Sequence, residues 1–163
     1  MILLNIISFY LEQSMMLLFG DNHLFVPLFS IVSLIMSYHL LRKKESIIIV
    51  GLILGLVYDI SLTQTLFLNT LIFLLLSIIV LLYYKYVTYN MINTIVITIL
   101  SIIVYRLLSY ITYIVLFDRN ISFIDLLTSI YRSLIINIVY VITLQILLKK
   151  KILKLKNVSI YSY

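Results

Sequence analysis

Residues 51–75 read GLILGLVYDISLTQTLFLNTLIFLL, two apolar runs joined by a short polar segment. The first run belongs to a stretch from Ile47 to Gln64, and the second to a stretch from Leu66 to Tyr84. Each stretch is close to the roughly 20 apolar residues that a helix needs to cross the hydrocarbon core of a bilayer. The polar segment is only a few residues long, so we predict a tight hairpin between two membrane helices.

The same pattern continues on both sides of this hairpin. Polar breaks divide the chain into six apolar runs: Ile2–Phe19, Leu24–Leu41, Ile47–Gln64, Leu66–Tyr84, Met91–Phe117 and Ile124–Leu148. The breaks contain Gly, Asp, Asn and basic residues, and Pro27 opens the second helix, as is usual at helix boundaries. The sequence therefore predicts an all-α integral membrane protein, a compact six-transmembrane-helix bundle. Residues 1–148 are expected to form this single domain, and residues 149–163 a basic cytoplasmic tail.

The composition excludes a soluble protein. The chain of 163 residues is 64% hydrophobic and 11% charged, whereas soluble domains are about 45–50% apolar and about 25% charged. No polar stretch is long enough to form a separate catalytic domain. Because the chain has no Cys, disulfides, thiolate zinc sites and cysteine nucleophiles are also excluded.

The basic residues outside the apolar runs are distributed unevenly. With six spans, nine of them fall on the side of the N-terminus: Arg42, Lys43, Lys44, Lys85, Lys149, Lys150, Lys151, Lys154 and Lys156. The opposite side has only Arg119. The positive-inside rule then places both termini in the cytoplasm, and the tyrosines at 83, 84, 86 and 89 fit a membrane interface. The net charge of +6 reflects this topology and contact with anionic lipid, not nucleic-acid binding.

Four ionisable residues fall deep inside the predicted spans: Glu12, Asp59, Arg106 and Arg132. Each costs about 2.5–3.5 kcal/mol at the centre of a membrane helix. All four lie roughly 16–19 Å from the cytoplasmic side if the two longest helices tilt. This shared depth predicts a buried cluster of ion pairs, with Asp59 pairing to Arg106 in preference to Arg132. The alternative is that Arg132 extends to the outer headgroups and Glu12 is protonated.

Polar residues also form stripes at helical spacing. The stripes are Asn5, Ser8 and Glu12; Thr98, Ser101, Tyr105, Ser109 and Thr112; and Ser129, Ser133, Asn137 and Tyr140. Such stripes either line a polar cavity or join neighbouring helices by hydrogen bonds, and the second arrangement is the more common.

The third run contains Gly51, Gly55 and Asp59 at spacings of four residues, a pattern that favours close packing against another helix. Together with the following turn and Asn69, this segment resembles the signature of the rod shape-determining protein MreD family. In that family a glycine-spaced helix ends in an Asp, and a short turn leads to a Gly-Leu-Asn-like start of the next helix. The length, the six spans and Pro27 also fit the resemblance.

The sequence departs from the family pattern in the turn. Thr63, Thr65 and Phe67 occupy places where the family often has Gly, Pro and Gly. These departures agree with the low glycine content of the whole chain, which has three glycines. The three departures leave open whether the turn has the geometry of the family.

The resemblance implies a function as well as a fold. MreD-like proteins are not enzymes, so no catalytic residue, cofactor or metal is expected. The implied partner is an MreC-like protein, through which the chain would link an MreB-like filament to a RodA-type glycosyltransferase and a class B penicillin-binding protein. The implied location is the bacterial cell membrane, and the implied bundle is similar to the substrate-binding subunits of energy-coupling-factor transporters.

Two other classes of function, a transporter subunit and a membrane enzyme, are weighed against this one. A substrate-binding subunit of a vitamin transporter usually presents Ala-x-x-x-Ala on its first helix, and this chain has no Ala. A rhomboid-type protease needs a buried His beside its Ser, but His23 and His39 fall at opposite ends of the second run and are interpreted as interface residues. Scattered single acids also disagree with a two-metal phosphotransferase.

Overall fold

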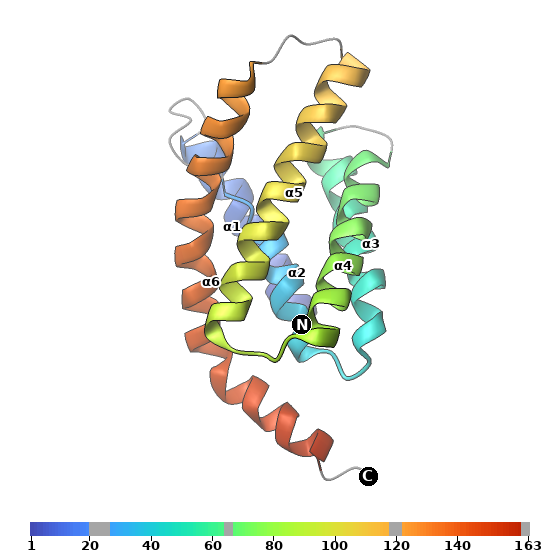
Figure 1. Ribbon diagram of the computed structural model, residues 1–163, viewed down its shortest axis with the longest axis vertical. Coiled ribbons are helices and arrows are strands. Elements are labelled where there is room, and N and C mark those ends of the chain that lie inside the picture. Colours follow the sequence, from blue (N-terminus) through green and yellow to red (C-terminus); the bar gives the residue numbers. More distant parts are fainter. Residues whose placement is uncertain (20–26, 64–66, 118–121, 161–163) are drawn as a thin grey trace.

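The backbone is helical almost throughout. A computed structural model describes residues 1–19, 27–63, 67–117 and 122–160, and within these ranges it contains six α-helices and no strand. The helices are α1 Ile2–Phe19, α2 Phe29–Leu40, α3 Ile47–Tyr58, α4 Leu68–Tyr86, α5 Met91–Phe117 and α6 Phe123–Ile160. They pack side by side (Figure 1), which confirms the predicted all-α bundle.

Two helices start later than predicted, and α1 and α5 have the predicted ends. α2 begins at Phe29 rather than at Leu24, because Pro27 and Leu28 are not helical. Leu28 is the residue before the helix, with φ −136° and ψ 49°, and Pro27 has no N–H to donate. α4 begins at Leu68 rather than at Leu66. Leu24 and Leu66 themselves lie outside the described residues.

The sixth helix is longer than predicted. α6 does not end at Leu148 but continues to Ile160, so most of the expected basic tail is helical. The added segment contains no Gly or Pro, and Lys and Leu favour helix. Ile152 is only 4% exposed and packs in a buried cluster with Met36 and Val141. The first turn of this extension is therefore attached to the bundle, and the rest bends away from it (Figure 1).

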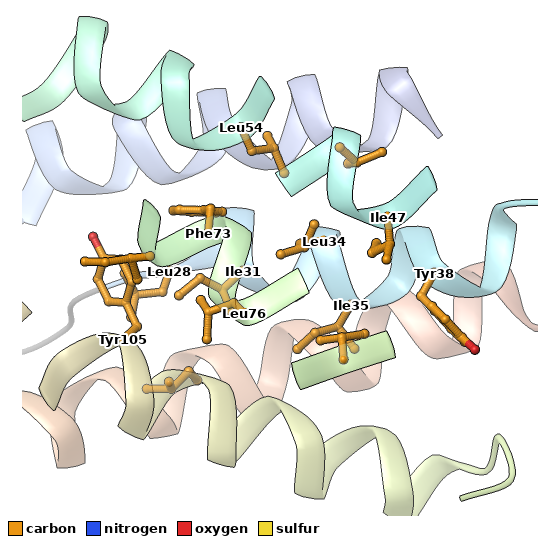
Figure 2. Close-up of a cluster of buried hydrophobic side chains, with 14 of the residues drawn as sticks. Leu28, Ile31, Leu34, Ile35, Tyr38, Ile47, Leu54, Phe73, Leu76 and Tyr105 are labelled. Carbon is orange, nitrogen blue, oxygen red and sulfur yellow. The ribbon is translucent and has the colours of Figure 1, made fainter. Parts of the chain in front are cut away.

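α2 is the central helix. It packs against α1, α3, α4, α5 and α6, and every residue from Phe29 to His39 is buried. Figure 2 shows Leu34 and Ile35 of α2 among side chains from α3 and α4. With 12 residues α2 is roughly 18 Å long, which is shorter than a hydrocarbon core of about 30 Å. Protein rather than lipid therefore surrounds this helix.

Three other helices have the length and composition to cross a membrane. They are α4, the segment Met91–Thr112 of α5 and the segment Phe123–Ile152 of α6. α1 and α2 are shorter apolar helices. The large exposed side chains of the described bundle are mostly Ile, Leu and Val. An outer surface of this kind is suited to contact with lipid acyl chains rather than with water.

α3 and α4 form an antiparallel pair with very close backbones. A Cβ atom added to Gly51 would collide with the Ser77 hydroxyl and lie 2.8 Å from the Phe73 carbonyl oxygen. A Cβ atom added to Gly55 would collide with the backbone at Thr70. The close packing predicted from the glycine spacing is therefore observed, and α4 is the helix that the glycines face.

The hairpin between α3 and α4 has an unusual backbone. α3 continues into a π-helical turn, Asp59–Thr63, and the residue directly before α4, Phe67, has a φ of +59°. This left-handed conformation is one that side chains other than Gly rarely adopt. The position where the MreD-like pattern often has Gly is thus a position where the backbone favours Gly.

One end of the bundle collects most of the lysines. The start of α1, the end of α6, the connection between α2 and α3 and the connection between α4 and α5 lie at this end (Figure 1), which we call the lysine-rich end. Lys44 donates hydrogen bonds to the carbonyl oxygens of Tyr38 (2.9 Å) and Leu41 (3.0 Å). It therefore satisfies carbonyl groups that the end of α2 leaves without helical partners.

An aromatic cluster lies at the same end. The ring of His39 packs 4.4 Å from the ring of Tyr84 and 4.2 Å from that of Tyr89, measured between centroids. His39 is 7% exposed, so its interpretation as an interface residue is wrong. Tyr86 is 81% exposed, as an interface residue should be, but Tyr84 and Tyr89 serve to cover the histidine.

Candidate functional site

Polar side chains from all six described α-helices and from the π-helical turn, all buried except the half-buried Arg106, meet near the end of the bundle opposite the lysines. The members of this polar layer are Glu12, Ser30, Tyr58, Asp59, Asn69, Thr70, Tyr105, Arg106, Ser133 and Asn137. Two helices, α2 and α4, begin inside the layer. The first N–H groups of a helix have no partner within the helix, so each of these helices needs acceptors from elsewhere.

Glu12 supplies an acceptor for α2. Its side chain is fully buried, and one carboxyl oxygen accepts a hydrogen bond from the backbone N–H of Ser30 at 2.9 Å. The other oxygen accepts a hydrogen bond from the hydroxyl of Tyr58 on α3. An acidic group is favourable beside the positive end of a helix dipole. Glu12 therefore joins α1 to the first turn of α2 and to the end of α3.

Asn137 holds the same turn of α2 from the opposite side. Its side-chain oxygen accepts a hydrogen bond from the backbone N–H of Leu28 at 3.0 Å. Its amide nitrogen donates to the carbonyl oxygen of Ser133, one turn earlier on α6, at 2.6 Å. The start of α2 is thus fixed by side chains of α1 and α6.

Asp59 supplies the acceptors for α4. One of its oxygens accepts from the backbone N–H (2.9 Å) and the side-chain amide (3.1 Å) of Asn69. The other accepts from the backbone N–H (2.9 Å) and the hydroxyl (2.7 Å) of Thr70. Because both oxygens take part, Asp59 caps α4 across the hairpin and fixes the position of α3 relative to α4.

The layer continues to α5 and α6. The Tyr105 hydroxyl donates to the side-chain oxygen of Asn69 at 3.2 Å. The Arg106 guanidinium donates from Nε (2.9 Å) and Nη2 (2.6 Å) to the hydroxyl of Ser133. Arg106 also lies within electrostatic range of Glu12. Glu12, Asp59 and Arg106 thus lie in the same polar layer, and their shared depth in a membrane stays a prediction.

Arg132 does not belong to this region. It is half-buried on α6, and it makes no hydrogen bond or ion pair within the part of the chain that the structure describes. The neighbouring residue, Ser133, faces the layer instead. The expected cluster of four ionisable residues therefore loses Arg132, whereas the pairing of Asp59 with Arg106 stays a prediction.

The polar stripes mainly serve helix packing. The Ser8 hydroxyl of α1 is 2.7 Å from the Tyr140 hydroxyl of α6, and Ser37 of α2 donates to the side-chain oxygen of Asn5 at 3.0 Å. Other hydroxyls, such as that of Thr98, donate to the carbonyl four residues earlier in their own helix. The Ser8–Tyr140 and Ser37–Asn5 contacts agree with interhelical hydrogen bonding rather than with a polar cavity.

Sequence reasoning missed Ser30, Tyr58 and Thr70. Thr70 follows Asn69 at the start of a helix, so a polar pair at that position was an available signal for a cap. Ser30 takes part through its backbone, and no residue type predicts that.

Within the described ranges no group of three His, Asp or Glu side chains could hold a metal ion.

These features define a class of protein: an all-α membrane protein whose helices are joined by an interior layer of hydrogen bonds. The family-model comparison gives the particular family. Residues 1–154 match rod shape-determining protein MreD, so the chain belongs to the MreD family and has a role in rod shape determination. The search of curated proteins and the search of solved structures found no match.

Proposed function

We propose that this chain is a non-enzymatic membrane component of the bacterial cell-wall elongation machinery. In this proposal it binds an MreC-like protein, and through it connects an MreB-like filament to a RodA-type glycosyltransferase and a class B penicillin-binding protein. The chain lies in the cell membrane with both termini in the cytoplasm. The observation that carries the proposal is the family match over residues 1–154.

The polar layer supports a scaffold rather than an enzyme. Among the described residues the two buried carboxyl groups, those of Glu12 and Asp59, cap helices and bind neighbouring side chains. A general acid or base must instead reach the proton of a substrate. The layer therefore fixes the relative positions of the helices, which is what a docking surface for another membrane protein requires.

A complementation experiment tests the proposal. The chain is expressed with an MreC-like protein from the same genome in a rod-shaped bacterium depleted of its own MreD-family protein. We expect restored rod width, and co-purification of the MreC-like protein in mild detergent. Restored shape without co-purification would contradict the partner, and a stoichiometric vitamin in the purified protein would favour the transporter function instead.

A further inference from the structure

A groove runs along the outside of the bundle between α1 and α3. Its volume is about 360 Å³, and its walls include Ile2 and Phe9 of α1 and Val50, Ile53 and Val57 of α3. The groove exists because α1 packs chiefly against α2. Ile2 and Ile53 are 68% and 56% exposed, so the groove opens to the surroundings of the bundle, and its lining suits acyl chains.

The lower end of the groove is positively charged. Met1 lines the groove at the lysine-rich end and lies within electrostatic range of Lys151 on α6. Lys151 is exposed, and so are Arg42 and Lys43, which precede α3 at the same end. Glu45 is the only acidic residue that the described chain places at this end. An apolar groove thus ends in a region of excess positive charge.

We propose that this groove binds one anionic phospholipid, with its acyl chains between α1 and α3 and its phosphate beside Lys151. The charge at the mouth complements a headgroup, because basic residues next to a membrane attract anionic lipids. This inference does not depend on the proposed MreC-like partner.

The headgroup contact is tested by native mass spectrometry. The protein is equilibrated in mild detergent with equal amounts of phosphatidylglycerol and phosphatidylethanolamine, and the retained lipid is counted. We expect one retained lipid with a preference for phosphatidylglycerol. Lys151→Gln should reduce this preference about fivefold, the usual contribution of one lysine near an anionic surface. The matched control Lys150→Gln, on the adjacent exposed residue, should leave it unchanged.

The acyl-chain contact is tested by filling the groove. Ile53→Trp should abolish retention of the lipid, whereas Leu82→Trp on α4, outside the groove and similarly exposed (51%), should not. Elution as a single folded species in size-exclusion chromatography verifies both variants. Equal retention in the two variants would overturn the proposal. So would a photo-crosslinker at position 53 that captures a protein in place of lipid in native membranes.

Discussion

Glu12 and Asp59 perform the same task at two places in the bundle. Each carboxyl group accepts hydrogen bonds from the first turn of a helix other than its own. Inside a membrane no water replaces such a partner, and an unsatisfied backbone N–H group costs several kcal/mol. The insertion cost of a buried acid, about 2.5–3.5 kcal/mol, is therefore offset where that acid satisfies several donors.

Asp59→Asn should destabilise the protein. The substitution turns one acceptor into an NH2 group that faces the N–H groups of Asn69 or Thr70. A buried donor left without an acceptor costs about 1–3 kcal/mol, so the midpoint of thermal unfolding in detergent should fall. Asp125→Asn is the matched control, because Asp125 accepts hydrogen bonds from Ser122 beside the start of α6 at an exposed position. If the unfolding midpoint fell equally in both variants, the burial of Asp59 would not explain its contribution to stability.

A double-mutant cycle tests the predicted pairing of Asp59 with Arg106. The free energy of unfolding is measured for Asp59→Asn, Arg106→Gln and the double variant. Groups in contact should show a coupling of roughly 0.5–3 kcal/mol. Arg132→Gln serves as the control, since Arg132 makes no hydrogen bond or ion pair within the described residues. Full additivity of Asp59→Asn with Arg106→Gln would show that the two side chains act independently.

Phe67→Gly should stabilise the protein. Phe67 has a φ of +59°, and this conformation costs a residue with a Cβ atom roughly 1–2 kcal/mol. Gly relieves this strain but loses about 0.5–1 kcal/mol through its greater backbone freedom, so we expect a net gain of up to about 1 kcal/mol. The ring is 58% exposed, so its removal sacrifices little packing. Phe67→Ala keeps the Cβ atom and should show no gain in the same unfolding measurement.

At the scale of elements, the pair α3–α4 is defined by two glycines with different neighbours. Gly51 faces the Ser77 hydroxyl, a side-chain group, as well as a carbonyl oxygen, whereas Gly55 faces only backbone atoms of α4. A side chain can adopt another rotamer, but the backbone of a helix cannot move without the whole helix. The same substitution should therefore have unequal effects at the two positions.

Gly55→Ala should destabilise the bundle more than Gly51→Ala. Overpacking of a tight interface usually costs about 1–3 kcal/mol, and we expect Gly55→Ala at the upper end of this range. Ser77→Ala removes the hydroxyl that an Ala at position 51 would meet. It should partly restore the stability of Gly51→Ala and leave that of Gly55→Ala unchanged. The midpoint of thermal unfolding in detergent is measured for all the variants. If Ser77→Ala restored the stability of both Gly51→Ala and Gly55→Ala, the different neighbours assigned to the two glycines would be contradicted.

The sequence predicts the ends of a helix well where the residues that determine them lie next to the helix in the chain. Polar breaks set the ends of α1 and α5 because those breaks lie directly next to the helices. The glycine spacing of α3 predicted a close neighbour, since only a packed face requires it. The predicted start of α2 was wrong because Pro27 and Leu28 are not helical, and the acceptors at the observed start belong to Glu12 and Asn137, which are distant in the chain. The role of Ser30 could not be predicted because it acts through its backbone N–H, and the role of Asp59 as a cap depends on the geometry of the hairpin between Asp59 and Asn69.

At the scale of the whole molecule, the lysine-rich end predicts the orientation in the membrane. Reporter fusions at the C-terminus and in the 42–46 loop should report the cytoplasm, and a fusion in the 118–123 loop should report the opposite side. The physical reason is the excess of Lys and Arg in short loops on one side, nine against one. A cytoplasmic signal from a fusion after Thr63 would contradict the six-span topology.

The enclosure of α2 has a consequence for biosynthesis. α2 is the second helix to leave the ribosome, yet its neighbours include the last two, α5 and α6. The backbone N–H of Leu28, directly before α2, has its acceptor on α6, at the side-chain oxygen of Asn137, so this partner is missing until translation nears its end. We therefore expect chains arrested after α4 to be substrates for membrane quality control, because the first four helices cannot enclose α2 without α5 and α6.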